Sequence, residues 1–225
     1  MNLLIISDIH NDIENLLTYL DKITLLDFDV IICPGDLTDI IIPKGFSRTE
    51  IAKIIINELK ILKKPLLMVP GNMDAEIISL LEEEDISLHG RGKVINNVGF
   101  YGYGGAKTPF NTPLEVTEEE LKKGLEKAYN EVKNSEIKVQ VTHMPPIGTN
   151  LDKIVSGAHV GSQAIRDFIE KHKPEVAISA HIHEAKGIDR LNDTILINSG
   201  RFPEGNCGLI SLKNGKAEAK IISLI

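Results

Sequence analysis

Five short apolar segments of the chain are each followed at once by polar side chains that can bind metal ions. The segments span residues 3–6, 30–33, 66–69, 139–141 and 176–179, and each has the length of a buried β-strand. Ligands of open α/β sheets bind outside the carboxyl ends of strands, so we expect these polar residues to meet at one rim. They are Asp8, His10, Asp36, Asn72, His143, His181 and His183.

Each of these residues, taken alone, has an ordinary structural explanation. An aspartate after a strand is commonly a turn former, and a single histidine is commonly a hydrogen-bonded core residue. Seven such residues after five strands are harder to explain in that way, and imidazole together with carboxylate suits first-row divalent metals. Asp8 and His10 stand two positions apart, as do His181 and His183, so both members of a pair can face one ion.

The number of candidate ligands predicts two ions rather than one. Seven ligands exceed what one tetrahedral ion accepts, but they divide well between two ions about 3.5–4 Å apart that share a carboxylate and a solvent oxygen. Two divalent cations, the carboxylates of Asp8 and Asp36 and a bridging hydroxide leave a local charge near plus one. A phosphate group is the natural ligand of such a centre.

The ordered set of motifs resembles the signature of the calcineurin-like metallophosphoesterases. That signature reads Asp-x-His, Gly-Asp, Gly-Asn-His-Asp/Glu, a lone His and Gly-His-x-His. This chain has Asp8-Ile9-His10, Gly35-Asp36, Gly71-Asn72-Met73-Asp74, His143 and Ala180-His181-Ile182-His183. The resemblance implies a double β-sandwich flanked by helices. It also implies one metal held by Asp8, His10, Asp36 and His183, and another held by Asp36, Asn72, His143 and His181.

Two positions depart from that signature. Ala180 replaces a glycine, which should only tighten the turn before His181. Met73 replaces the histidine that family members use to stabilise the transition state and to protonate the leaving oxygen. A thioether does neither, and general acid–base catalysis commonly contributes about 10²–10⁴-fold. Prokaryotic members with cysteine at this position are still phosphoesterases, so the resemblance to that branch implies a narrower chemistry.

Four other polar residues receive separate interpretations. Asp74 either orients Asn72 or a metal-bound water, or caps the helix that follows it. His159 ends the loop 145–160, which we expect to form one wall of the pocket, and either meets a phosphate oxygen or is a surface residue. We expect His89 and His172 at the surface.

The sequence therefore predicts a metal-dependent hydrolase of phosphate esters, in which a bridging hydroxide attacks phosphorus. Asp36, Asn72 and Asp74 are the expected catalytic residues, and Asn72, His143 and His159 are expected to contact substrate. Phosphodiesters or activated esters are favoured, because a site without the histidine acid suits leaving groups that need no proton. Manganese is the favoured ion, with nickel, iron, zinc or magnesium left open. The alternatives are a non-catalytic or weakly active metal-binding scaffold on the same fold, and a nuclease.

Composition and charge narrow the class of protein. With 225 residues, of which 42% are hydrophobic and 25% charged, the chain is expected to form a single α/β domain over residues 1–225. Its net charge of −7 argues against nucleic acid as a partner, because binding phosphates needs clustered Lys and Arg. We expect a cytoplasmic protein without a membrane span, with buried thiols at Cys33 and Cys207. A small phosphate ester is the expected partner, and a homo-oligomer is left open.

Alternating strand and helix signals predict a sheet with parallel strands and crossover helices. Helix N-caps are expected at Asp12, at Ser47 with Glu50, and at Thr117 with Glu120. After residue 188, turn signals at 191–193, 203–206 and 213–215 predict short β segments in a second sheet rich in antiparallel strands. The expected helices span residues 12–20, 47–62, 74–84, 117–133 and 161–172. Further short strands lie in 93–103, and the segment 139–141 belongs to a strand over 137–142.

Overall fold

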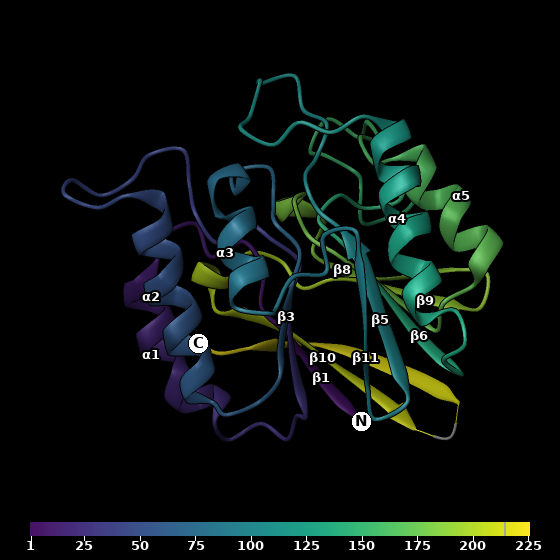
Figure 1. Ribbon diagram of the computed structural model, residues 1–225, viewed down its shortest axis with the longest axis horizontal. Helices are drawn as coiled ribbons and strands as arrows, with labels where there is room; N and C mark the ends of the chain where they lie inside the picture. The colour runs from purple at the N-terminus through teal and green to yellow at the C-terminus, as the bar shows by residue number, and fades with distance from the viewer. Residues whose placement is uncertain (214) are drawn as a thin grey trace.

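The computed structural model describes residues 1–213 and 215–225, whose strands form two sheets (Figure 1). The five-stranded sheet has the order β11–β10–β1–β2–β3, and the six-stranded sheet has the order β4–β5–β6–β7–β9–β8. In the first sheet the strands are β1 (Asn2–Ile5), β2 (Val30–Cys33), β3 (Leu66–Met68), β10 (Asn206–Lys213) and β11 (Lys216–Ser223). In the second they are β4 (Arg91–Ile95), β5 (Val98–Tyr103), β6 (Ile137–Thr142), β7 (Val176–Ser179), β8 (Gly187–Leu191) and β9 (Thr194–Asn198).

Helices cover the outer face of each sheet, with α1, α2 and α3 on one side of the molecule and α4 and α5 on the other (Figure 1). They are α1 (Ile13–Ile23), α2 (Arg48–Ile61), α3 (Ile78–Glu83), α4 (Glu118–Val132) and α5 (Gln163–His172). The three predicted N-caps are confirmed, because Asp12 accepts from the backbone of Asn15 while Ser47 and Thr117 each complete a capping box. The predicted helix 74–84 is instead a 3₁₀ turn (η1, Ala75–Ile77) followed by α3.

The apolar residues form three layers, and the alternation of side chains along the strands builds them. On β1, Leu3 and Ile5 face the space between the two sheets, while Leu4 packs with the helices α1 and α2. A third cluster lies between the second sheet and the helices α4 and α5. The predicted mixed α/β fold, with two sheets flanked by helices, is therefore confirmed.

The expected distribution of antiparallel strands is wrong. The second sheet pairs β5, β6, β7 and β9 in parallel and is antiparallel only at its edge strands β4 and β8. The strands β10 and β11 return to the first sheet, where β10 pairs antiparallel with β1. The physical reason is burial: β9 is buried along its whole length and takes an interior position, whereas the partly exposed β11 lies at an edge.

Several smaller expectations have outcomes of their own. Cys33 and Cys207 are both buried free thiols, and burial raises the pKa of Cys207 to about 12. Of the turn at 213–215, Asn214 lies outside the described residues. Among the described residues, no helix is both long enough and apolar enough to cross a membrane.

Candidate metal centre

The loops that follow β1, β2, β6 and β7 are tied together by backbone hydrogen bonds. The amide of Asp8 donates to the carbonyl of Gly35 at 3.1 Å, and that of His10 donates to the carbonyl of Asp36 at 3.0 Å. On the second sheet, Ala180 donates to the carbonyl of His143 at 2.9 Å. These bonds hold the polar residues of different strands at a common rim, as expected from the sequence.

Four of the candidate ligands have a left-handed backbone. The φ angles are +53° at Asp8, +50° at His10, +51° at Asp36 and +72° at His181. Such a conformation costs a non-glycine residue about 1–2 kcal/mol and is uncommon outside turns. Backbone strain of this kind concentrates at functional sites, where it re-aims side chains that a regular strand end would direct elsewhere. Ala180 is not among the positive-φ residues, so its side chain is tolerated there.

Two glycines allow the loop after β2 to approach the loop after β3. A Cβ atom on Gly71 would lie 2.0 Å from Oδ1 of Asp36, and one on Gly35 would lie 2.5 Å from the amide nitrogen of Gly71. Gly35 also has a φ of +112°, which other residues rarely adopt. The Gly-Asp and Gly-Asn pairs are therefore required by close packing as well as by chemistry.

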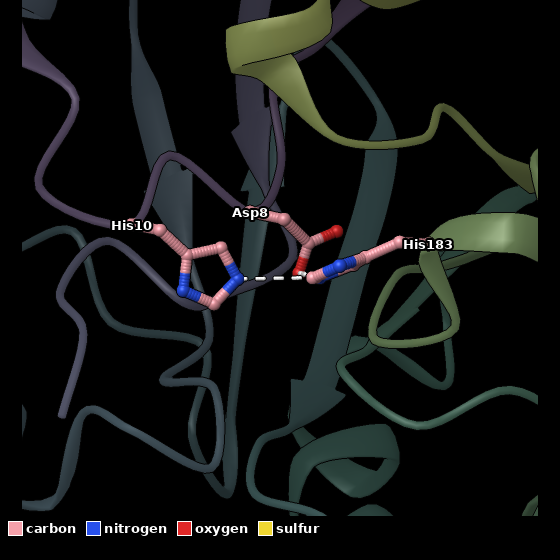
Figure 2. Close-up of side chains that lie close together, drawn as sticks. All are labelled: Asp8, His10 and His183. Atoms are coloured by element: carbon pink, nitrogen blue, oxygen red, sulfur yellow. Dashed lines mark hydrogen bonds and ion pairs between the residues drawn. The ribbon is translucent and has the colours of Figure 1, made fainter.

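Asp8, His10 and His183 form the first group of candidate ligands (Figure 2). Their side chains point toward one another from the loop after β1 and from the 3₁₀ turn η2 (His183–Ala185). Nε2 of His10 lies 3.2 Å from Nε2 of His183, which in turn lies 3.7 Å from Oδ1 of Asp8. Asp8 is fully buried, yet neither of its carboxylate oxygens has a hydrogen-bond partner among the described residues.

Asp36, His143 and His181 form the second group. Nε2 of His143 lies 2.9 Å from Oδ1 of Asn72 and 3.4 Å from Oδ2 of Asp36. Its Nδ1 lies 2.8 Å from the carbonyl oxygen of Pro34, and when Nδ1 carries the proton the lone pair of Nε2 is free for an ion. Asn72 adds its amide oxygen to this group, since that oxygen lies beside Nε2 of His143.

One carboxylate oxygen joins the two groups. Oδ2 of Asp36 lies 3.7 Å from Nε2 of His10 in the first group and 3.4 Å from Nε2 of His143 in the second. Its other oxygen, Oδ1, accepts from the backbone of Met73 at 2.9 Å, which fixes the orientation of the carboxylate. The residues present therefore fit two cations: each group offers imidazole and carboxylate, and the buried oxygens of Asp8 lack any other partner among the described residues.

The pKa values of the second ligand group are shifted by burial and by the closeness of its members to one another. Burial opposes protonation of His143, but the nearby Asp36 outweighs it and raises the pKa of His143 to about 9. Burial opposes ionisation of Asp36, but His143 lowers its pKa below the usual range. Burial and the charge of His143 lower the pKa of His181 to about 4. A cation bound to the second group must displace the proton of His143, so its affinity falls as the pH falls below about 9.

Asp74 joins two loops of the site, so its interpretation as a helix cap is wrong, while its orientation of a metal-bound water stays a prediction. Its side chain forms no cap hydrogen bond with the helix that follows, and it does not bond to the Asn72 side chain. Instead it accepts from the backbones of Leu37, Thr38 and Gly71 at 2.9–3.1 Å. Asp74 thereby joins the loop that carries Asp36 to the loop that carries Asn72.

His159 anchors a loop. Its Nδ1 lies 2.7 Å from Oδ1 of Asp152, and its side chain is 43% exposed. Asp152 is buried and also accepts from the backbones of Gly148, Thr149 and Gly161, so its carboxylate organises the whole segment 145–162. The expected contact between His159 and a phosphate oxygen stays a prediction.

Two histidines expected at the surface are half-buried instead. His89 stacks on Tyr103 with ring centroids 4.1 Å apart, and burial, with a contribution from Lys127, lowers its pKa to about 4. His172 stacks on Phe168 at 4.2 Å. Tyr103 lies 14 positions after His89, and Phe168 lies one helical turn before His172. The residue type of a histidine alone does not show that such an aromatic ring will cover it.

Sequence reasoning missed Asp39, which lies beside the first group. Its Oδ2 is 3.7 Å from Nδ1 of His10, and that nitrogen has no hydrogen-bond partner among the described residues. The other ring nitrogen of His10, Nε2, faces His183. A carboxylate behind a metal-binding imidazole fixes its tautomer and raises its basicity. The available signal was the position of Asp39, three residues after Asp36 on the same loop.

Replacing Asp39 by asparagine should weaken the binding of one cation out of two. We expect about a 10–100-fold lower affinity at the group of Asp8, His10 and His183, because His10 loses the negative charge that lies 3.7 Å from its Nδ1. Titration of the metal-free protein with Mn²⁺ by calorimetry measures both sites. Asp193→Asn, an exposed substitution of the same kind, is the control. An unchanged pair of affinities in Asp39→Asn would contradict this role.

Comparison with known proteins places the chain in a family. Residues 1–185 match the family described as calcineurin-like phosphoesterase. The chain is 37% identical over 179 residues to the uncharacterised protein MJ1162 of Methanocaldococcus jannaschii, with 76% of each chain covered. In fold it is similar to TT1561 of Thermus thermophilus (TM-score 0.71, 20% identity, 100% of this chain and 99% of that chain). It is also similar in fold to a dimetal phosphatase from Danio rerio (TM-score 0.64, 12% identity, 100% and 96%). The chain belongs to the calcineurin-like phosphoesterase family.

Proposed function

We propose that this protein hydrolyses phosphoric ester bonds with two divalent cations, of which manganese is the favoured metal. The observation that carries the proposal is the position of Asp36 Oδ2, within 3.7 Å of His10 and 3.4 Å of His143, so that one carboxylate serves both ligand groups. Membership of a phosphoesterase family and the similarity in fold to a dimetal phosphatase support it.

Bound divalent cations supply Lewis-acid polarisation of a phosphoryl oxygen and a nucleophile derived from water at neutral pH. The side chains of this protein supply the ligands that would hold these cations. Asp8, His10 and His183 would hold one cation, and His143, His181 and Asn72 would hold the other, with Asp36 available to both groups. The amide nitrogen of Asn72 is left free to donate to a phosphoryl oxygen as negative charge develops there. Asp74 acts through the two loops that it joins, and is therefore a positioning residue.

The leaving group is restricted by Met73. This residue donates its backbone amide to Asp36, so it lies directly beside the centre, and its thioether cannot donate a proton. The four histidines of the two groups are engaged as candidate ligands. We therefore favour substrates whose leaving oxygen needs no proton, namely diesters or activated esters of small molecules.

Hydrolysis of a panel of phosphate monoesters and diesters tests the function. We expect turnover when Mn²⁺, Ni²⁺, Zn²⁺ or Mg²⁺ is added to the metal-free protein, with nitrophenyl diesters hydrolysed faster than alkyl monoesters. The control is Asp8→Asn, which removes the ionised carboxylate from the first group. Absence of turnover with every ester, in protein shown by elemental analysis to hold metal, would support a metal-binding scaffold instead.

Substitution of His159 by alanine tests the substrate contact. With Nδ1 of His159 paired to Asp152, the other ring nitrogen is left to meet a phosphate oxygen. We expect kcat/KM to fall by about 3–10-fold across the ester panel, while metal content stays unchanged because His159 is in neither ligand group. Lys153→Ala, on the same loop, is the matched control. An unchanged kcat/KM would assign His159 to loop structure alone.

A further inference from the structure

Arg201 follows directly on a turn that is fastened to the first ligand group. The hydroxyl of Ser7 donates to the carbonyl of Gly200 at 2.9 Å, and the amide of Phe202 donates to the carbonyl of Ser7 at 3.0 Å. Ser7 precedes Asp8 in the chain and pairs with Arg201 in an isolated β-bridge. The backbone of Arg201 is therefore held next to the strand end that carries Asp8.

The same turn is tied to the loop of His183. Asn198 donates its side-chain amide to the carbonyl of Ile182 at 2.8 Å and accepts from the backbone of Gly200 at 2.9 Å. Two separate connections, to Ser7 and to Ile182, fix this arginine beside the candidate metal centre.

The guanidinium of Arg201 has no partner of its own among the described residues. Its Nε is buried without a hydrogen bond, and no carboxylate in that part of the chain forms an ion pair with it. The neighbouring Lys186 differs, because its stem packs against Gly200 and its Nζ donates to the side-chain oxygen of Asn206 at 2.9 Å. A half-buried, unpaired guanidinium beside a cationic centre is unfavourable unless an anion joins it.

We propose that Arg201 binds a second anionic group of the substrate, and that the substrate class is a phosphoanhydride, in which the leaving group is itself a phosphate. This inference rests on the proposed two-metal hydrolysis and extends it from phosphoric esters to phosphoric anhydrides. A phosphate diester carries one negative charge, which two bound cations would already neutralise. An anhydride carries a further charged phosphoryl group. Arginine is suited to that group because its planar fork binds phosphate oxygens in pairs.

The thioether of Met73 agrees with such a substrate. In the hydrolysis, an oxygen of water forms a bond to one phosphorus, and the bond from that phosphorus to the bridging oxygen breaks. The bridging oxygen keeps the electron pair and leaves as an oxygen of the second phosphate, and the two protons of water pass to the products or the solvent. A phosphate leaves without being protonated first, so no side-chain acid is needed at Met73, and Arg201 stabilises the charge that develops on it.

Binding of two non-hydrolysable ligands to the Mn²⁺-loaded protein tests the assignment. Methylenediphosphonate carries two linked phosphoryl groups, and methylphosphonate carries one. In Arg201→Met we expect the affinity for methylenediphosphonate to fall by about 10–100-fold and that for methylphosphonate by less than about 3-fold. In Arg201→Lys the affinity for methylenediphosphonate should lie between those of the wild type and Arg201→Met, since lysine keeps the positive charge but lacks the planar guanidinium. Arg190→Met, an exposed arginine on β8, removes the same charge elsewhere and should change neither affinity.

Ligand affinity, metal content, the thermal midpoint and hydrolysis together separate the outcomes. Metal content and the thermal midpoint should match the wild type in Arg201→Met, and if that variant does not fold, Arg201→Lys alone decides. Equal weakening of both ligands, or no weakening of either, overturns the assignment of Arg201. Selective weakening in a protein that hydrolyses neither esters nor anhydrides would uphold the anion site and reject the proposed hydrolase. Hydrolysis of esters, together with equal weakening of both ligands in Arg201→Met, would uphold the proposed hydrolase and reject the anion site at Arg201.

Discussion

Replacement of Asp36 by asparagine is expected to lower the affinity for both cations, each by at least about 100-fold. Oδ2 of this residue lies between the two ligand groups, so its charge is shared by both. Loss of a partner that merely orients a ligand costs about 10–100-fold, and a directly shared carboxylate should cost more. Elemental analysis and Mn²⁺ titration measure the effect, with two ions per chain expected in the wild type.

The arrangement of neighbours makes this substitution informative. Oδ1 of Asp36 accepts from the amide of Met73, and an asparagine keeps that bond when its oxygen takes the place of Oδ1. The fold should therefore remain while the shared charge is lost. Asp193→Asn again serves as the control for a surface substitution. One tightly bound ion per chain, unaffected by Asp36→Asn, would falsify the dinuclear centre.

Substitution of Met73 by histidine is expected to produce the largest gain in rate. It introduces an imidazole next to Asp36 and Asn72, where a proton can be delivered to a leaving oxygen. Hydrolysis of esters with alkoxide-like leaving groups should rise by about 10²-fold or more, and hydrolysis of nitrophenyl esters by much less. Phosphoanhydrides should behave like the nitrophenyl esters. Steady-state kinetics on matched pairs of esters measures the difference.

The variant Met73→Leu tests whether a change of side chain at this position alters the rates without supplying a proton. Met73→Leu conserves volume but offers no proton, so it should leave the relative rates of the two ester classes unchanged. If Met73→His accelerates both classes equally, the proton already comes from another group and the interpretation of Met73 is wrong. The pH dependence should also change in Met73→His alone, because only this variant adds a titrating acid.

Local features of the fold could be predicted because short-range interactions decide them. The N-caps at Ser47 and Thr117 depend on residues three positions away, and the structure has both capping boxes. The strands at 30–33 and 137–142 were identified with their bounds, and the first is continuously apolar because a strand buried on both faces carries apolar side chains throughout. The pairing of β9 with β7 and of β10 with β1, in different sheets, could not be predicted. It depends on which strands still have an unpaired edge in the folded protein.

The seven candidate ligands could also be named from the sequence, since each directly follows an apolar strand segment. Their types indicated divalent metal and the ordered motifs indicated the family. Each of these inferences uses residues close together in the chain or the order of motifs along it. The sequence by itself therefore determined which chemistry is available, and at which end of the strands.

Only the tertiary structure decided how that chemistry is arranged. It showed that Oδ2 of Asp36 faces both groups, that Asp74 joins two loops instead of capping a helix, and that Asp39 stands behind His10. It also paired Arg201 with Ser7, the residue before Asp8, although the two stand 194 positions apart in the chain. The physical reason is that distances between side chains on different strands depend on strand order and on the left-handed turns at the strand ends, which are properties of the assembled sheets.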